Sequence, residues 1–130
     1  KKDRVDDAVC AVRAALEEGI LPGGGVALKD IAAGLEVNNK GAEILQLAML
    51  APMIKILSNA GIEVDSSDFD ESKQLSKPGV GMNVANGAIC HMMSVGIIDP
   101  TKVTKEAIKN AVPVATTLLS TETVITNVRA

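Results

Sequence analysis

The sequence predicts a mainly α protein, a multihelical bundle with one small β-hairpin. Its 130 residues are enough for one domain with a core and too few for two domains of ordinary size. The apolar residues are almost all aliphatic, with one Phe and no Trp or Tyr, and such a core favours helix packing. Several segments repeat apolar residues at helical spacing, whereas glycines crowd a later stretch that suits short strands and tight turns.

The first half of the chain predicts three helices. In residues 4–19, apolar residues recur at spacings of four, three and four, and Gly19 gives a C-terminal stop. A shorter helix is expected over residues 26–35. A third should start after Asn38 or Asn39, either of which can cap it, and continue to residues 59–61. Pro52 should end or kink that helix, because proline lacks the N–H and crowds the preceding turn.

The second half begins with an acidic, Ser-rich and Lys-rich stretch, residues 63–78, which predicts a solvated loop without the register of a calcium loop. Residues 79–98 predict short strands joined by tight turns. A last helix should follow, capped by Asp99 or Thr101, with a kink at Pro113. Residues 121–128 alternate like a closing strand.

Three successive glycines, Gly23, Gly24 and Gly25, come directly before the second helix. Backbone N–H groups at a helix start can bind a phosphate or another polar ligand, which makes a nucleotide one candidate. The stretch matches neither G-x-x-x-x-G-K-[ST] nor G-x-G-x-x-G. Taken alone, a hinge or a close backbone contact explains the glycines equally well.

Composition argues against several classes of function. A net charge of −3 and the near absence of aromatic residues argue against nucleic-acid binding. No run of 18 apolar residues occurs, so we expect no membrane span, and we expect no signal peptide. Two cysteines without a disulfide pattern suit a reducing compartment, cytoplasmic or an organelle matrix. No metal site is expected at residues 90–93, because neighbours in an extended segment alternate faces. The chain does not begin with Met, and we expect it to be a piece of something longer.

Several motifs occur together in a familiar order. They are RVDDA (4–8), GGGVAL (23–28), AMLAP (48–52) with SNAG (58–61), GMNVANG (81–87) and VGIIDPTKVT (95–104). In this order the chain resembles the C-terminal part of a group I chaperonin, the GroEL family. The resemblance implies that residues 1–18 are the end of the intermediate domain, a returning helix. It implies that residues 19–130 are the second half of the equatorial domain, which binds ATP and forms ring contacts in that family.

The resemblance carries functional residues onto this sequence. Asp7 matches a catalytic aspartate that orients the attacking water, as phosphoryl transfer requires. Gly24 matches a glycine that approaches the ribose, Asn83 an amide that hydrogen-bonds adenine, and Asp99 an acid that binds the ribose hydroxyls. Val84 stands where Ala is usual beside the adenine-binding Asn, and it would crowd or tighten the base pocket.

Each of these roles has a plainer alternative. Asp7 lies on the same side of its helix as Asp3, Cys10 and Ala14, away from the valines, and an acid there can simply complement the helix N-terminus. Its neighbour Asp6 is a rival for the role. The Asn at position 83 can be a turn residue, and the acid at position 99 can be a helix cap.

The family's Gly-Asp-Gly-Thr-Thr phosphate loop, its metal-binding acid and its apical domain do not occur in these residues. We therefore expect Mg²⁺ ligands for ATP or ADP elsewhere and no ATPase activity from this chain alone. The resemblance implies a homo-oligomeric ring, a co-chaperonin and unfolded polypeptides as partners of the parent protein. A catalytically inactive scaffold and a small adenosine-binding module remain alternatives. The isolated chain should self-associate, because the apolar faces of residues 5–16, 44–57 and 103–119 would lack partners.

Overall fold

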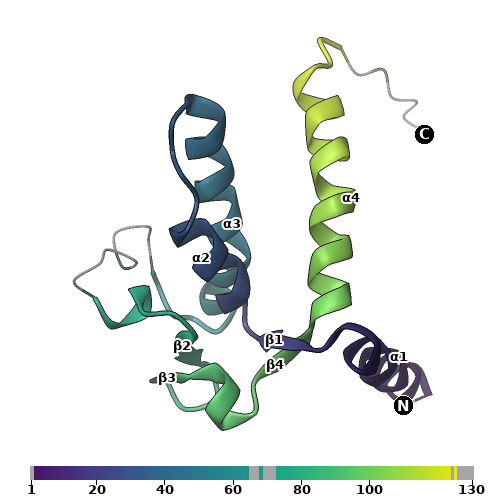
Figure 1. Ribbon diagram of the computed structural model, residues 1–130, viewed down its shortest axis with the longest axis vertical. Coiled ribbons are helices and arrows are strands. Elements are labelled where there is room, and N and C mark those ends of the chain that lie inside the picture. The colour runs from purple at the N-terminus through teal and green to yellow at the C-terminus, as the bar shows by residue number, and fades with distance from the viewer. Residues whose placement is uncertain (1, 65–67, 69–72, 124, 126–130) are drawn as a thin grey trace, which may run out of the picture.

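Figure 1 shows the computed structural model, which describes residues 2–64, 68, 73–123 and 125. The described chain is mainly helical, as predicted. Its elements in chain order are α1 (Lys2–Glu18), β1 (Ile20–Pro22), α2 (Val26–Ala33), α3 (Lys40–Asn59), the 3-10 turn η2 (Gln74–Ser76), β2 (Val80–Asn83), β3 (Ala88–His91), the 3-10 turn η3 (Met92–Val95), β4 (Ile98–Pro100) and α4 (Thr101–Leu119).

The helices pack in two pairs, α2 with α3 and α1 with α4. Between the pairs lies a short antiparallel ribbon of β1 and β4, in which Leu21 is opposite Asp99 (Figure 1). The predicted hairpin is confirmed as β2 and β3, with Asn83 opposite Ala88 at its tip. The ribbon places the glycine turn after β1 beside β4, although the two segments are far apart in sequence.

The core lies between α2, α3 and the hairpin. The buried residues Val26, Met53, Leu57, Leu75 and Met92 form one cluster. Met92 and Leu75 come from the 3-10 turns that flank the hairpin, so the hairpin segment closes the open side of the α2–α3 pair. No described residue of α1 or α4 is buried.

The third helix begins as predicted, because the side chain of Asn39 accepts a hydrogen bond from the amide of Ala42 at 2.9 Å. Of the two effects expected at Pro52, an end of the helix is ruled out, because α3 continues through that residue to Asn59, where the helix was predicted to stop. By length and composition α3 is apolar enough to cross a membrane. Core helices can have the same composition, but Met53 and Leu57 are the buried residues of α3, so most of its apolar surface is uncovered.

The last helix starts differently from the prediction. Pro100 is its N-cap residue and no side chain caps the helix, so neither Asp99 nor Thr101 has the predicted capping role. Instead the amide of Thr101 donates to the carbonyl of Gly19 at 3.1 Å, which ties the helix start to the end of α1. Helix α4 continues through Pro113. Of the predicted closing strand 121–128, residues 121–123 form no strand, and residues 124 and 126–128 lie outside the described residues.

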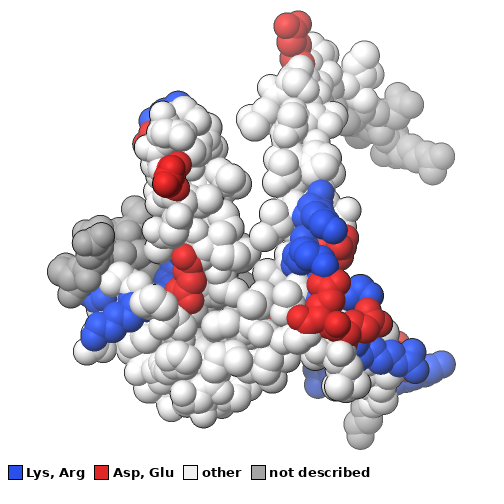
Figure 2. All heavy atoms as spheres, in the orientation of Figure 1, with Lys and Arg blue, Asp and Glu red and all other residues white. Residues whose placement is uncertain are grey.

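The predicted apolar stripes are largely exposed. Leu16 at the end of α1 is 82 % exposed, and Leu119 at the end of α4 is 86 % exposed. Residues 110–121 carry no charge, and the space-filling view shows the corresponding length of α4 without Lys, Arg, Asp or Glu (Figure 2). The expectation that this chain leaves apolar helix faces uncovered is confirmed.

Candidate functional site

The glycine turn lies against the start of β4. The amide of Gly23 donates to the carbonyl of Ile97 at 3.0 Å, and a Cβ added to Gly23 would stand 3.1 Å from the amide nitrogen of Ile98. The turn therefore extends the ribbon by one backbone contact before α2 begins. This contact holds residues 23–25 next to the segment that carries Asp99.

Close packing within the chain explains much of the glycine triplet. Gly24 and Gly25 both adopt positive φ, +67° and +80°, a conformation that side chains disfavour. A Cβ on Gly25 would lie 2.8 Å from the backbone nitrogen of Met53 in α3, and a Cβ on Gly24 would lie 2.9 Å from Cε of Met92. Both glycines are half-buried, but the obstacle at Gly24 is the flexible end of a side chain, whereas at Gly25 it is the backbone of α3.

Asp99 has an unused carboxylate. It is half-buried in the middle of β4, opposite Leu21, and it does not cap α4. Within the described part of the chain, no hydrogen bond or ion pair engages its side chain. A partly buried carboxylate without partners can accept hydrogen bonds from a ligand's hydroxyl groups.

Asn83 ends β2 and shapes the turn that follows it. Its side-chain oxygen accepts from the amide of Ala85 at 3.0 Å, and its carbonyl accepts from the amide of Gly87 at 2.8 Å. Asn83 therefore does stabilise a turn, which was the alternative to its role as an adenine contact. The side-chain oxygen is occupied, but no described residue accepts from the side-chain nitrogen, which remains available as a donor. Val84, the next residue, is 46 % exposed.

The hairpin and the glycine turn meet at Met92. A Cβ on Gly81 would lie 2.5 Å from Cγ2 of Val26 and 3.1 Å from Met92, the same side chain whose end lies near Gly24. Asn83 follows Gly81 by two residues, roughly 7 Å along the strand at about 3.3 Å per residue. The structure thus packs the segments of Gly24 and Asn83 together through one shared side chain.

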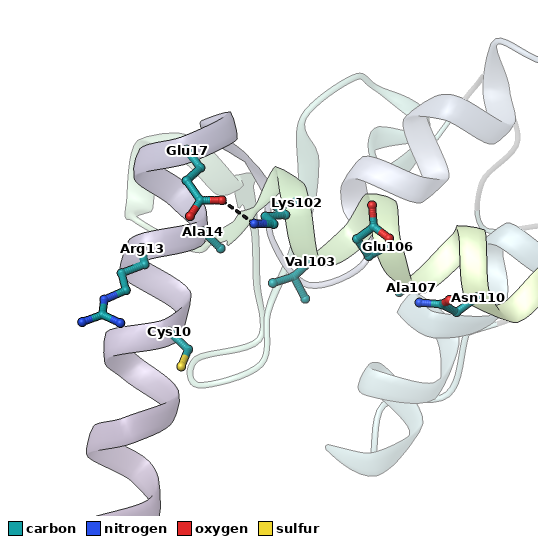
Figure 3. Close-up of a pocket in the computed structure, with 9 residues that line it drawn as sticks. All are labelled: Cys10, Arg13, Ala14, Glu17, Lys102, Val103, Glu106, Ala107 and Asn110. Atoms are coloured by element: carbon teal, nitrogen blue, oxygen red, sulfur yellow. Dashed lines mark hydrogen bonds and ion pairs between the residues drawn. The ribbon is translucent and has the colours of Figure 1, made fainter.

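Asp7 stands apart from this group. It is exposed on α1, twelve residues before Gly19, or roughly 18 Å along the axis at about 1.5 Å per residue. No hydrogen bond or ion pair joins it to another described residue. Its predicted side of the helix does face a hollow: a groove of about 600 Å³ between α1 and α4 is lined by Cys10, Ala14 and Glu17, which share that side (Figure 3).

Two ion pairs hold α1 against α4 beside this groove. Lys102 contacts Glu17, and Lys105 contacts Glu18 (Figure 3 shows the first pair). The hydrogen bond from Lys102 and its positive charge lower the pKa of Glu17, and the same pair raises the pKa of Lys102. Charged side chains of both signs gather where these helices meet (Figure 2).

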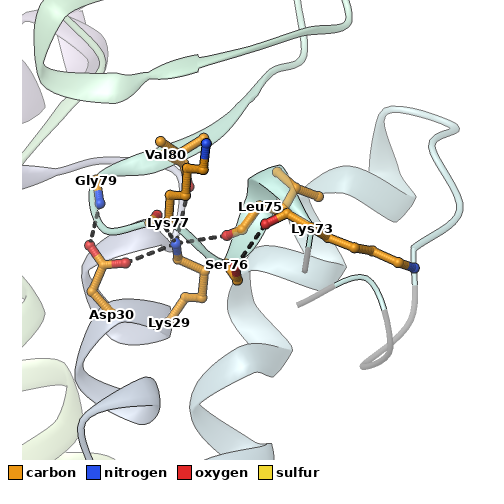
Figure 4. A network of polar contacts seen from close by, with 8 residues as sticks. All are labelled: Lys29, Asp30, Lys73, Leu75, Ser76, Lys77, Gly79 and Val80. Carbon is orange, nitrogen blue, oxygen red and sulfur yellow. Dashed lines mark hydrogen bonds and ion pairs between the residues drawn. The ribbon is translucent and has the colours of Figure 1, made fainter. Parts of the chain in front are cut away.

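Sequence reasoning overlooked Lys29 and Asp30 in α2. The Lys29 side chain is buried, and its ammonium donates to the carbonyls of Leu75, Lys77 and Val80 at 2.9, 2.8 and 3.2 Å (Figure 4). Asp30 lies 2.8 Å from that ammonium through Oδ1 and accepts from the amide of Gly79 through Oδ2 at 2.7 Å. The signal was a Lys-Asp pair inside an otherwise apolar helix, VALKDIAA.

Metal binding finds no support in the residues that the structure describes, among which no three His, Cys, Asp or Glu side chains gather. The carboxylates of Asp7 and Asp99 lie on separate elements, α1 and β4. The described residues therefore offer no group of three such ligands for Mg²⁺.

Comparison with known proteins identifies the family. The model of the TCP-1/cpn60 chaperonin family matches residues 1–129. The chain is 45% identical over 135 aligned residues to the chaperonin homolog Hsp-60, mitochondrial, of Caenorhabditis elegans. That alignment covers 98% of this chain and 24% of the relative, so the chain spans about a quarter of the relative's length. The match extends over nearly every residue, and the chain belongs to the TCP-1/cpn60 chaperonin family.

Proposed function

We propose that this chain supplies the nucleoside-binding half of the ATP site of a chaperonin that assists protein folding. The observation that carries the proposal is the free carboxylate of Asp99, half-buried on the strand that packs against the glycine turn. A carboxylate in that position can accept both hydroxyl groups of a ribose laid over the turn. Family membership supports the chaperone role in general.

The other residues have roles consistent with their contacts. Gly24 lets the ribose approach the backbone, and Asn83 donates a hydrogen bond from its side-chain nitrogen to an acceptor on adenine. Its oxygen keeps the turn through the amide of Ala85. Val84, which is partly exposed beside it, provides an apolar wall for the base.

Hydrolysis needs groups that the described residues do not provide. Asp7 is proposed to orient the attacking water, and its side of α1 borders a groove that can admit a ligand. Bound Mg²⁺ would neutralise the charge of the transferring phosphoryl group. We place its ligands outside this chain, together with the loop that holds the phosphates.

We propose the remaining assignments from the resemblance to the family. Residues 1–18 form the end of the intermediate domain, and residues 19–130 form the second half of the equatorial domain. The parent protein assembles as a homo-oligomeric ring that works with a co-chaperonin on unfolded polypeptides. We propose an organelle matrix as its location, because the C. elegans relative is named as mitochondrial.

The proposal is tested by titrating the chain with adenosine, ADP and ATP while light scattering records its mass. We expect saturable binding of all three, weakened by Asp99→Asn, which keeps the size of the side chain and removes its charge. Asp3→Asn, the same change at an exposed position of α1, is the matched control. A chain that binds none of the three but forms multimers would instead be a scaffold, a role that its exposed apolar faces also suit.

A further inference from the structure

The Lys29–Asp30 pair connects the two segments to which the nucleoside is assigned. The backbone amide of Lys29 donates to the carbonyl of Gly25 at 3.2 Å, so the residue is one helical turn beyond the glycines. Its side chain reaches in the other direction, to the backbone that leads into the hairpin (Figure 4). Together with Asp30, it engages four backbone groups between residues 75 and 80.

Burial makes these contacts strong constraints. Lys29 is 2 % exposed, and a buried ammonium is stable only where its hydrogens are satisfied. An ammonium has three hydrogens, and here three carbonyl oxygens accept them. The contact with Oδ1 of Asp30 is therefore electrostatic, and that buried oxygen accepts no hydrogen bond from a described residue.

Removing the ammonium would free the hairpin. The carbonyls of Leu75, Lys77 and Val80 would lose their shared donor, and a buried acceptor without a donor is costly. Water would enter or the segment would move away from α2. Either response shifts β2, which begins at Val80 and ends at Asn83, relative to the glycine turn.

We infer that Lys29, supported by Asp30, is a positioning residue for nucleoside binding. It holds Asn83 at a fixed position relative to the glycine turn. The inference rests on the proposed function. Lys29 is buried and its hydrogens are occupied, so it acts through the backbone of residues 75–80 and touches no ligand. Loss of Lys29 should therefore weaken the contacts that the hairpin makes with the adenosine moiety. The loss of affinity should be the same whether or not the ligand carries phosphates.

The test measures binding and hydrogen exchange on the 130-residue chain and three variants. Lys29→Met removes the ammonium and retains an unbranched apolar side chain. Asp30→Ala releases the amide of Gly79 and also removes the carboxylate that lies 2.8 Å from the buried ammonium, while the three carbonyl contacts of Lys29 stay in place. Lys55→Met makes the same substitution at an exposed position of α3 and is the control.

We expect Lys29→Met to speed amide exchange over residues 79–83 and to raise the Kd for adenosine and ADP by the same factor. If the hairpin keeps its position for only about a tenth of the time, that factor is about ten. Asp30→Ala should speed exchange at Gly79 and raise both Kd values by roughly two- to threefold, and Lys55→Met should change neither. By reciprocity, saturating adenosine should restore protection of residues 79–83 in Lys29→Met.

The outcomes separate the two proposals. If the unaltered chain binds adenosine and both affinities stay unchanged in Lys29→Met and Asp30→Ala, the positioning role is wrong and the proposed function stands. Bound adenosine that leaves exchange of residues 79–83 unaltered would also overturn the role. An unaltered chain that binds neither ligand overturns both proposals. If Lys29→Met does not fold, Asp30→Ala decides the question alone.

Discussion

Replacing Gly25 with Ala should destabilise the fold more than the same change at another glycine of similar backbone conformation. Gly25 has a φ of +80°, and a Cβ there would lie 2.8 Å from the backbone nitrogen of Met53. Gly61 has a φ of +77°, with no atom within 4 Å of its Cβ position. Comparing the two variants therefore separates two contributions. Both variants have the strain of Ala at positive φ, but only Gly25→Ala adds a steric clash with the backbone of α3.

The magnitudes follow from these two contributions. A left-handed Ala costs about 1–2 kcal/mol, the whole expected effect of Gly61→Ala. Overpacking adds about 1–3 kcal/mol for Gly25→Ala, because the clashing atoms belong to the backbone of a helix and cannot rotate away. Gly24→Ala should resemble Gly61→Ala in stability, since only the mobile end of Met92 lies near its Cβ position.

Urea denaturation followed by circular dichroism measures the three variants on one scale. The extra contribution at Gly25 should lower the urea midpoint by about 1 M relative to Gly61→Ala, given a slope of about 1–3 kcal/mol per M. Loss of folding in Gly25→Ala alone would agree with the same reasoning. Equal midpoints for Gly25→Ala and Gly61→Ala would refute the close approach of the turn to α3.

Four further predictions concern function, assembly and pH. In the assembled parent protein, Asp7→Ala should keep ATP affinity and slow hydrolysis by about two to four orders of magnitude, roughly 3–5 kcal/mol; loss of affinity in a binding assay would make Asp7 a binding residue. The chain alone should release no phosphate from ATP, because it lacks the phosphate loop; steady release abolished by Asp7→Ala would contradict this. Sedimentation at micromolar concentration should show self-association that weakens when Leu119, 86 % exposed, becomes Lys; a monomer that binds no hydrophobic dye argues against it. The pKa of Glu17 is lowered by Lys102, so their contact is present above the ordinary Glu pKa of about 4 and is lost as pH falls through the lowered value. An NMR titration should show the pKa of Glu17 rising in Lys102→Met, and no change there would contradict the ion pair.

Local signals in the sequence were sufficient for the helices and the hairpin. Apolar spacing predicted α1 and α2, and Asn39 caps α3 by the bond that its position suggested. Pro52 was expected to end or kink the third helix, and α3 continues past it to the predicted limit at Asn59 while packing on α2. A proline in a helix costs one hydrogen bond, which tertiary packing can offset.

The candidate site was less accessible to sequence reasoning, because its geometry depends on contacts between distant segments. A cap role for Asp99 was as reasonable as a ligand role until the ribbon placed Pro100 at the N-cap. Lysine in a helix usually lies in water, and nothing local indicates that residues 75–80 bring three carbonyls to Lys29. The ligand roles of Asp7, Gly24, Asn83, Val84 and Asp99 stay predictions.

The most direct test of the nucleoside site is an NMR map of backbone amide shifts during a titration with adenosine. The segments assigned to the ligand are residues 23–25, 83–87 and 97–99, which are far apart in sequence; the first lies against residues 97 and 98, and the second follows Gly81, which packs on Met92. Our account predicts that all three respond together, with one shared Kd, while residues 44–50 of α3 do not. Shifts confined to the groove between α1 and α4, or no saturable shift at any concentration of adenosine, would contradict it.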